Sequence, residues 1–401
     1  MFETRIAITG LGIFCAAGKN LPEFRAALLE GHSGIGPVEL FDVSSFPSHI
    51  GAEVRGYDPC DRFNRREAAR YSRADQFAVI AAEEALRGSG VLEFYDTFDL
   101  GVSVGAGAAG MLHGEQWLKG LLAGCREDPS LISGVLPDRT ATVLASRLGI
   151  AGYQGSITTA CSSSATAIGW GADLVASGRL KAVLCGGTDA LSLLTYAGFN
   201  SLRVVDPNPC APFSLGREGI SLGEGAAFMV LEREDEARRR GAAIHGTIVG
   251  YAMTGEGYHM TAPEPSGSEA ARVMRNALDH AGISPYSVGW VNAHGTGTPL
   301  NDVVETRGMK LVFGDRSPAV PLVSTKPLTG HCLGAAGAIE ALATVIALND
   351  GFIPRTLNFR GADPECDLDY CHEGLRDSDA VIALSNSFAF GGNITTLVLS
   401  R

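Results

Sequence analysis

Cys161 is the residue of this sequence best placed to act as a nucleophile. It follows a β-branched run, residues 156–160, and precedes Ala, Ile, Trp and Leu at helical spacing up to residue 177. A cysteine in the first turn of a helix faces unpaired backbone N–H groups and the positive end of the helix dipole, which stabilise a thiolate. Most lone cysteines are small core residues instead, and we assign that role to Cys15, Cys125, Cys185 and Cys210.

Two histidines and one lysine lie in loops that directly follow predicted strands. His294 lies in Asn292-Ala293-His294-Gly295-Thr296-Gly297-Thr298, directly after a short apolar run. Lys326 and His331 lie between the run 321–325 and a small-residue helix that the pattern predicts over 334–348. Loops at strand ends can present imidazole, ammonium and hydroxyl groups into a cleft. Taken alone, each segment is also explained as a structural turn.

A third segment, Phe388-Ala389-Phe390-Gly391-Gly392-Asn393, combines aromatic bulk with adjacent glycines. This combination is typical of a flexible lid or of a close backbone approach. A β-hairpin turn explains the same residues nearly as well.

Two other motifs suggest different chemistry. Gly105-Ala106-Gly107-Ala108-Ala109-Gly110 matches the dinucleotide-binding pattern, but Glu127, at the spacing of the ribose-binding acid, lies in a loop rather than at a strand end. Gly101-Val102-Ser103-Val104-Gly105 matches the hydrolase pattern, but it places Ser103 inside a predicted strand rather than on an exposed turn. We therefore set aside an oxidoreductase and a serine hydrolase.

Composition describes an ordinary globular protein. The chain has 401 residues, 45% of them hydrophobic, and a formal net charge of −12, which disfavours nucleic-acid binding. We find no secretion signal, and the apolar run 338–348 is shorter than the roughly 20 residues of a membrane helix. Nine scattered cysteines without metal-like spacing indicate free thiols, no metal site and a cytoplasmic location.

One basic cluster stands out in this acidic chain. It consists of Arg62, Arg65, Arg66, Arg70 and Arg73. It could bind an acidic partner, or it could be a solvated helix face with Glu67 and Asp75 as partners.

The reactive residues require a scaffold of βα units. Apolar runs that end in glycine-rich turns and lead into helices predict an α/β fold with a mostly parallel sheet. The outline of 156–177 recurs over 321–348, and that of Asp99 to Lys119 recurs over Ser287 to Lys310, which indicates an internal duplication. The halves would meet near residues 235–250, where the charged segment 232–240 reads as an exposed helix.

Taken together, these motifs resemble those of the β-ketoacyl-[acyl-carrier-protein] synthases, of the elongating rather than the initiating kind. The resemblance spans essentially the whole chain. It rests on Thr159-Ala160-Cys161-Ser162-Ser163, Asn292-Ala293-His294-Gly295-Thr296, Lys326 through His331 to Gly337, and Asn386 to Gly392. It implies a thiolase-like fold, two duplicated halves in five α-β-α-β-α layers, with halves at 1–243 and 244–401. It also implies a homodimer, or a heterodimer with a related subunit.

The resemblance implies a role for each motif residue. Cys161 would carry the acyl chain, and His294 and His331 would support loss of carbon dioxide from malonyl-carrier protein, with Lys326 maintaining the site and Glu305 and Glu340 supporting it. The remaining implied residues are the oxyanion-hole N–H groups of Cys161 and Phe390, the gate residues Phe388, Ala389 and Gly391, the pantetheine-binding Thr296 and Thr298, and Ala108 in the acyl pocket.

The resemblance also implies a protein partner, and the chain differs from the family pattern at a few positions. Arg62, Arg65, Arg66, Arg70 and Arg203 would dock the acidic acyl carrier protein, and no cofactor is required beyond its phosphopantetheine arm. Ala389 replaces a usual glycine and Asn393-Ile394 a usual Thr-Asn pair, which would stiffen the gate. Fatty-acid elongation is the expected function, with a specialised polyketide synthase, or less readily a non-catalytic chain-length-factor-like subunit, as the alternative.

Overall fold

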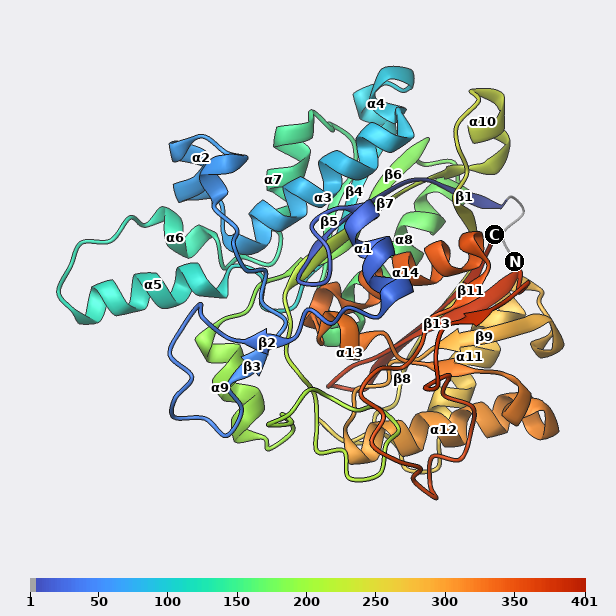
Figure 1. Cartoon of the computed structure of the whole chain (residues 1–401). Coiled ribbons are helices and arrows are strands. Elements are labelled where there is room, and N and C mark those ends of the chain that lie inside the picture. The colour runs from blue at the N-terminus through green and yellow to red at the C-terminus, as the bar shows by residue number, and fades with distance from the viewer. Residues whose placement is uncertain (1–4) are drawn as a thin grey trace.

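The computed structural model describes residues 5–401, and a ten-stranded mixed sheet forms its centre (Figure 1). The first half of the chain contributes β1 (Ile6–Cys15), β4 (Leu100–Gly105), β5 (Gln154–Ile157), β6 (Ala182–Asp189) and β7 (Gly225–Arg233). The second half contributes β8 (Gly246–Gly255), β9 (Val288–Asn292), β10 (Leu322–Val323), β13 (Ile382–Phe388) and β14 (Asn393–Ser400). Two small hairpin sheets pair β2 (Gly36–Pro37) with β3 (Ile50–Gly51) and β11 (Phe352–Ile353) with β12 (Arg376–Asp377).

The two halves of the sheet have the same topology. The strand order is β5-β4-β6-β7-β1 in the first half and β10-β9-β13-β14-β8 in the second. In each, the first three strands are parallel and the last two pairings are antiparallel. β1 and β8 pair antiparallel, with Ile6 opposite Ile248, and join the halves. The predicted α/β fold with two duplicated halves is confirmed. The prediction of a mostly parallel sheet is wrong, because four of its strand pairings are parallel and five are antiparallel.

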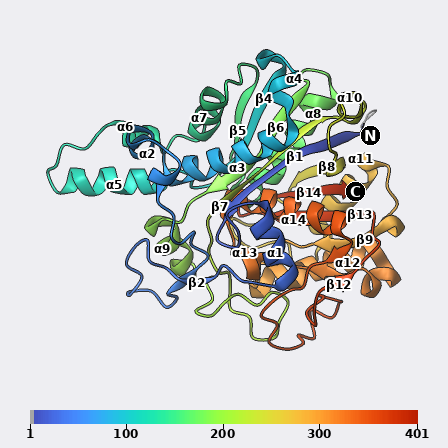
Figure 2. The ribbon, with the colours of Figure 1, turned by 45° about the horizontal axis from the view of Figure 1, so that its top comes forward.

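Six helices form three layers around the two half-sheets (Figures 1 and 2). α3 (Arg73–Ser89) and α7 (Arg139–Leu148) cover the outer face of the first half, and α11 (Ser268–Ala281) and α12 (Pro299–Phe313) cover that of the second. α8 (Ser163–Ala176) and α14 (Ala336–Asp350) contact each other between the halves. The predicted five layers follow. The other helices are α1 (Leu21–Glu30), α2 (Arg65–Arg70), α4 (Val91–Phe94), α5 (Met111–Leu122), α6 (Ser130–Ser133), α9 (Leu193–Ser201), α10 (Glu234–Arg239) and α13 (Lys326–Thr329).

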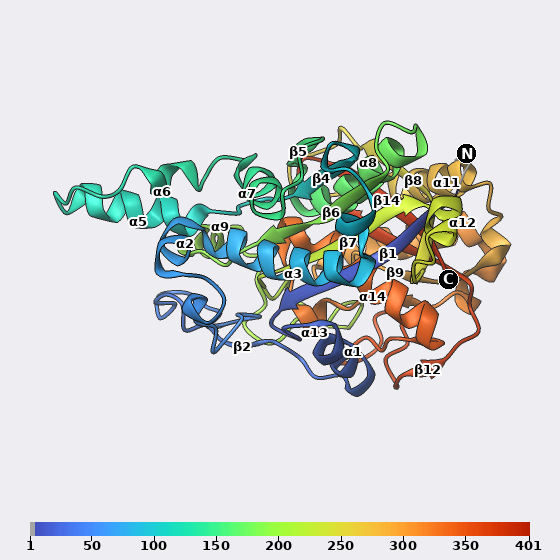
Figure 3. The ribbon, with the colours of Figure 1, turned by 90° about the horizontal axis from the view of Figure 1, so that it is seen from above.

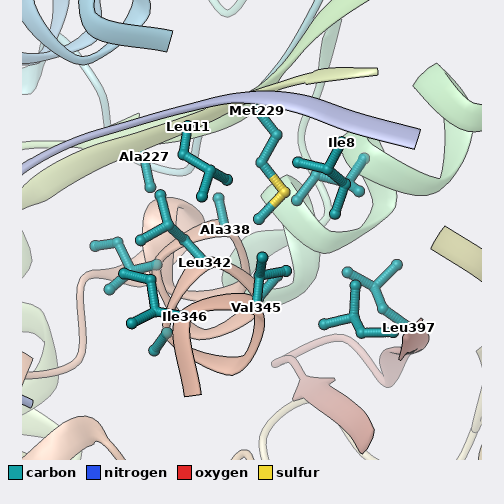
Figure 4. Packing of buried hydrophobic residues seen from close by; sticks show 14 of the residues in the cluster. Ile8, Leu11, Ala227, Met229, Ala338, Leu342, Val345, Ile346 and Leu397 are labelled. Carbon is teal, nitrogen blue, oxygen red and sulfur yellow. The ribbon is translucent and has the colours of Figure 1, made fainter. Parts of the chain in front are cut away.

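The middle layer explains why α14 is apolar on every side. Every residue from Ala336 to Leu348 is buried, and Figure 4 shows Leu342 and Val345 beneath side chains of β1 and β7, Leu11 and Met229 among them. The helical stretch Leu333–Asp350, 18 residues, is long and apolar enough to cross a membrane, longer than the sequence suggested. However, 89% of it is buried inside the protein.

The outer helices are amphipathic, as surface helices should be. α11 buries Ala270, Val273, Met274, Ala277 and Leu278, which fall at positions i, i+3, i+4, i+7 and i+8 of one helical face. It ends at Gly282, whose φ of +66° is left-handed and favours glycine. This pattern positions α11 against the second half-sheet.

The first half also carries an arm that the sequence did not predict. α5 and α6 extend away from the body in Figure 3, and the tip exposes Leu118, Leu121 and Leu122. The predicted likeness of Asp99 to Lys119 and Ser287 to Lys310 holds in outline, because each contains a strand, a glycine-containing turn and the start of a helix, but α5 leaves the sheet whereas α12 packs onto it. α7, which contacts β4 and β5, takes the corresponding position in the first half. The predicted border at residue 243 falls between α10 and β8.

Candidate active site

A cavity of about 330 Å³ gathers most of the predicted site residues. Cys161 lines it from the turn before α8, and His331 from the turn before α14. The loop after β9 contributes His294, Thr296 and Thr298, and the β13–β14 connection contributes Phe388, Ala389 and Phe390. Lys326, Glu305 and Glu340 are buried but do not line the cavity. The two halves of the fold thus meet at one site.

Cys161 lies in a sharp turn between strand and helix. β5 ends at Ile157, and a 3₁₀ turn, Ala160–Ser162, precedes the first residue of α8. Ala160 has a φ of +49°, a left-handed conformation that non-glycine residues adopt rarely and mostly where function demands it. Ser163 supports this turn, because its Oγ accepts from the Thr159 N–H at 2.9 Å and donates to the Ala160 carbonyl at 2.6 Å.

The environment of Cys161 disfavours a free thiolate. The side chain is buried, and burial raises the pKa of the thiol to about 12, although the charge of Lys326 and the backbone N–H of Phe390 lower it. The expected stabilisation of the thiolate by the helix is therefore outweighed by removal from water. The thiol is protonated at neutral pH, and its proton must leave when the sulfur attacks a substrate.

His294 and His331 form a pair of neutral hydrogen-bond donors. Their ring centroids are 5.3 Å apart and the rings are nearly perpendicular, at 83°. Burial, followed by the charge of Lys326, lowers the pKa of both imidazoles well below 6.5. The Nδ1 of His331 accepts from the Leu333 N–H at 3.2 Å, and that of His294 faces the Lys326 ammonium at 3.2 Å. The proton of each ring is therefore on Nε2.

Lys326 holds His294 from behind. Its Nζ donates to the His294 carbonyl at 2.5 Å as well as to Nδ1, and forms an ion pair with the Glu340 carboxylate. These three acceptors satisfy the three ammonium hydrogens. Burial raises the pKa of Glu340 to about 7, against the opposing effect of Lys326. The lysine thus fixes the histidine rather than facing the cavity.

Glu305 supports the same loop by a different route. Its carboxylate accepts from the N–H groups of His294 and Gly295, both at 2.9 Å, and from the Asn386 side chain at 3.0 Å. Glu340 contacts Lys326 as expected, whereas Glu305 binds the backbone that carries His294. Burial raises the pKa of Glu305, although these donors lower it.

Residues 388–393 form a hairpin turn, as one of the two interpretations predicts, and their role as a lid stays a prediction. The segment connects β13 to β14, with the Ala389 N–H donating to the Asn393 carbonyl at 2.9 Å. Gly391 and Gly392 have φ of +84° and +77°, which require glycine. The Gly391 N–H donates to the Met260 carbonyl at 2.8 Å, so this turn is also bound to the loop after β8.

Phe390 closes the cavity beside the nucleophile. Its ring stacks on Phe199, with centroids 5.8 Å apart at 24°. Its backbone N–H stabilises the Cys161 thiolate, so the same donor can face an oxygen of a group attached to the sulfur. This geometry suits an oxyanion hole.

Family models for the β-ketoacyl synthases match most of the chain. The model of the N-terminal domain matches residues 3–237, and that of the C-terminal domain matches residues 245–360. The chain belongs to the β-ketoacyl synthase family. Its curated relatives include 3-oxoacyl-[acyl-carrier-protein] synthase 2 of Synechocystis sp., 39% identical over 100% of this chain and 98% of the relative, and that of Coxiella burnetii, 38% identical over 100% and 99%.

Solved ketosynthase structures share the whole fold of this β-ketoacyl synthase. The ishigamide ketosynthase/chain length factor superposes with a TM-score of 0.92 at 34% identity, covering 99% of both chains. A type II PKS acyl-carrier protein in complex with its ketosynthase bound to the hexaketide gives a TM-score of 0.91 at 29% identity, again covering 99% of both chains. The predicted thiolase-like fold is confirmed by these neighbours.

The mouth of the synthase's cavity is polar on one wall and apolar at the rim. Thr296 and Thr298 place their Oγ1 atoms 2.9 Å apart on the wall, and the Thr298 side chain also caps α12. Leu202, Met260 and Leu300 line the cavity and are exposed at its edge. An elongated substrate arm with amide groups would find hydroxyl partners here.

Ala108 lies outside the cavity lining. It packs against a hydrophobic cluster that contains Tyr196, Ile220 and Leu333, and Ile220 forms the cavity wall. The structure therefore places Ala108 behind the wall rather than on the surface of this cavity.

The backbone donors of the glycine-rich turn after β4 are already hydrogen-bonded inside the protein. The N–H groups of Gly107, Ala108 and Ala109 donate to the carboxylate of Asp189 at 2.9, 2.8 and 2.5 Å. An internal acid thus occupies the donors that a dinucleotide would need. Ser103 is fully buried in β4 and donates to the Ala167 carbonyl at 3.0 Å, so the hydrolase pattern has no exposed nucleophile.

Most of the basic cluster lies on the surface. Arg62, Arg65, Arg66 and Arg70, which lie in or beside α2, are exposed, and so is Arg203 after α9. Arg73 is different, because it points inward to an ion pair with Glu224 at 2.6 Å. The surface patch therefore consists of four arginines, and Arg73 is not part of it.

The expected acidic partners of this cluster are also elsewhere. Glu67 forms an ion pair with Arg147 at 2.6 Å, and the buried Asp75 accepts from Thr140 at 2.8 Å. The solvated helix face is therefore confirmed for Arg65, Arg66 and Arg70, whereas Glu67 and Asp75 as its partners are wrong.

All nine cysteines are free, and among residues 5–401 we find no cluster of His, Cys, Asp and Glu side chains that could hold a metal ion. Cys15, Cys185 and Cys210 are buried as predicted, but Cys125 is exposed on the arm. Its predicted core role is wrong, because α5 leaves the body of the protein.

One supporting residue, Asp302, was not predicted from the sequence. Asp302 accepts from the Phe213 N–H at 2.7 Å and the Gly297 N–H at 3.2 Å, and forms an ion pair with Arg217 at 3.3 Å. It thereby braces the loop that carries His294. The sequence feature that could have indicated it is an acidic residue in the first turn of the helix that follows Thr298.

Proposed function

We propose that the protein is a β-ketoacyl-[acyl-carrier-protein] synthase that elongates a fatty-acyl or similar chain by decarboxylative condensation. Cys161, His294 and His331 on one cavity, with neutral donor histidines, carry this proposal. Both curated relatives are named 3-oxoacyl-[acyl-carrier-protein] synthase 2.

The first half-reaction is a transfer of the acyl group. The Cys161 sulfur attacks the carbonyl carbon of an acyl thioester on the carrier's phosphopantetheine arm, and the carrier thiol leaves with a proton. The N–H groups of Cys161 and Phe390 donate hydrogen bonds to the oxyanion that forms. An acyl-enzyme divides a difficult condensation into two easier steps.

The second half-reaction forms the carbon–carbon bond. The Nε2–H groups of His294 and His331 donate to the thioester carbonyl of a malonyl group, which stabilises the enolate as carbon dioxide leaves. The enolate carbon attacks the acyl-Cys161 carbonyl, and the bond to the sulfur breaks. A β-ketoacyl carrier is released, and the Cys161 thiolate takes a proton from solvent water.

Exposed arginines of the chain suit an acidic carrier protein. Arg203 directly follows Leu202 of the cavity rim, Arg62, Arg65, Arg66 and Arg70 lie in or beside α2, and we assign the pantetheine arm to Thr296 and Thr298. One structural neighbour is a ketosynthase in complex with an acyl-carrier protein. No cofactor is needed beyond the arm that brings the substrates.

A dimer is supported by the open edge of the sheet. β5 is the terminal strand, and its residues 154–157 are partly exposed. An unpaired edge strand readily pairs with another chain, and the exposed leucines of the arm offer further apolar surface. We infer a homodimer in the cytoplasm, with a related subunit as the alternative partner.

A specialised polyketide or other secondary-metabolite ketosynthase is the second candidate. It is favoured by the likeness to the ishigamide ketosynthase/chain length factor. A non-catalytic chain-length-factor-like role is less well supported, because Cys161 and both histidines are present and converge.

The test is a labelling and turnover assay. Wild type, Cys161→Ala and the exposed-site control Cys125→Ala are incubated with a radiolabelled acyl carrier and malonyl carrier. Wild type and Cys125→Ala should become labelled and release carbon dioxide, whereas Cys161→Ala should not become labelled. Labelling of Cys161→Ala equal to wild type would contradict the mechanism, and inactivity of wild type with several carriers would favour the partner-subunit role.

A further inference from the structure

Asp189, the last residue of β6, is a buried carboxylate held entirely by backbone N–H groups. Its Oδ1 accepts from Ala108 and Ala109 at 2.8 and 2.5 Å, and its Oδ2 accepts from Gly107 and Gly334 at 2.9 and 2.6 Å. It is 0% exposed, and within residues 5–401 no cation pairs with it. Burying a carboxylate without a paired cation costs free energy of folding, and its hydrogen bonds must offset that cost.

The four donors come from two turns in different halves of the fold. Gly107 to Ala109 follow β4, whereas Gly334 follows the turn that carries His331. The turns are packed so closely that a Cβ on Gly334 would lie 2.4 Å from the Gly107 nitrogen. Asp189 therefore binds the His331 turn to the glycine-rich turn.

Both turns hold a residue in an unfavourable backbone conformation. Ala109 has a φ of +35° and Leu333 a φ of +48°, where non-glycine residues are strained. Asp189 binds the N–H of Ala109 itself and that of Gly334, directly after Leu333. Leu333 in turn donates its own N–H to the Nδ1 of His331, so the strained turn also sets the tautomer of that histidine.

The charge of Asp189 also reaches the nucleophile. Asp189 and Glu340 oppose the Cys161 thiolate, and Lys326 favours it, while the neighbouring His294 and His331 are neutral. The carboxylate of Asp189 thus makes ionisation of the Cys161 thiol less favourable. It is still needed, because without it four backbone N–H groups would lose their hydrogen-bond acceptor.

We propose that Asp189 is a positioning residue that fixes the His331 turn against the glycine-rich turn and so directs the Nε2–H of His331 into the cavity. The inference rests on the proposed function, because the alignment matters for decarboxylation.

Asp189→Asn tests the proposal, since an amide keeps one acceptor oxygen and replaces the other by a donor. The matched control is Asp75→Asn, at a buried aspartate that accepts from Ser72 and Thr140 outside the site. Rates are expressed per Cys161 that can be acylated, so a loss of folded protein does not count. We expect Asp189→Asn to lower kcat for decarboxylation by about tenfold or more, with little change in KM.

A second readout follows the charge. Removing the carboxylate lowers the pKa of the Cys161 thiol, so iodoacetamide should alkylate Cys161 about threefold faster at pH 8 in Asp189→Asn than in Asp75→Asn. Decarboxylation and alkylation rates equal to those of Asp75→Asn would overturn the proposal.

The proposal stays testable if the variant does not fold or wild type does not condense. Hydrogen exchange of wild type should show the amides of 107–109 and 334 protected far more than those of the exposed loop around Glu365. Exchange at the same rate as that loop would overturn the role of Asp189. Inactive wild type with protected amides would instead refute only the proposed function.

Discussion

Lys326 donates from a single Nζ to both the carbonyl oxygen and the Nδ1 of His294, at 2.5 and 3.2 Å. The lysine therefore fixes the position of the loop and the tautomer of the ring together. Because the ring keeps its proton on Nε2, the histidine acts in the cavity as a neutral donor.

Replacing this lysine separates the two half-reactions. Lys326→Met should lower the rate of malonyl decarboxylation at least about 100-fold, because His294 loses its fixed tautomer, while acylation of Cys161 falls only a few-fold. Carbon dioxide release and single-turnover labelling measure the two steps. Lys310→Met, at an exposed lysine paired with Asp367, is the control and should behave as wild type. Equal losses in both steps would contradict a role centred on His294.

The reactivity of Cys161 should depend steeply on pH. Because burial raises the pKa of its thiol to about 12, the thiolate fraction rises about tenfold per pH unit throughout pH 7 to 9. Iodoacetamide labelling followed by mass spectrometry of the Cys161 peptide measures the slope. A rate independent of pH over this interval would mean that the thiol is already ionised.

The gate should open faster when its alanine is removed. Ala389→Gly restores backbone freedom to the turn between β13 and β14, and we expect a roughly two- to fivefold faster acylation of Cys161. Ala243→Gly, in the connection between α10 and β8, is a control away from the site. An unchanged or slower acylation would show that Ala389 does not limit gate opening.

The basic patch should act on carrier-borne substrates alone. Reversing Arg65, Arg66 and Arg70 to Glu should raise KM for an acyl carrier protein about tenfold at low salt, with a smaller effect at high salt. A free acyl-pantetheine thioester should react unchanged. Arg238→Glu, at an exposed arginine on α10, serves as the charge control. Equal effects on both substrates would assign the loss to the site rather than to docking.

Ala108 gives a test of chain length. Ala108→Phe adds bulk to the cluster behind Ile220, and we expect the ratio of kcat/KM for a long-chain to a medium-chain acyl carrier to fall about tenfold or more. Ala243→Phe, at an exposed position, controls for the added ring. An unchanged ratio would mean that the acyl chain does not reach this cluster.

The residues that face the cavity were predictable because they stand at strand ends and in local motifs. Cys161, His294 and His331 each follow a β-rich run, and the carboxyl ends of the parallel strands within one half-sheet lie at one edge. The edges of the two half-sheets come together only because α8 packs against α14, which the sequence does not show. The duplication was predictable for the same reason, since repeated βα outlines imply repeated strand order.

What depends on distant contacts was not predictable. The four N–H groups on Asp189 come from turns roughly 80 residues before it and 145 residues after it. Arg73 turns inward because Glu224, 151 residues away, is buried beneath it. The helical pattern of α5 predicts a helix but does not show that this helix leaves the sheet. The raised pKa of the Cys161 thiol was also not predictable, because it comes from burial in the assembled cavity.

The position of β1 has a consequence for biosynthesis. This first strand pairs with β7 of the first half and with β8 of the second half. In addition, α14 of the second half packs against α8 and β7 of the first half. A nascent chain that has left the ribosome only as far as residue 243 therefore exposes an apolar face and an open strand edge. Folding must wait for the 158 residues that follow residue 243, which predicts slow maturation and dependence on chaperones.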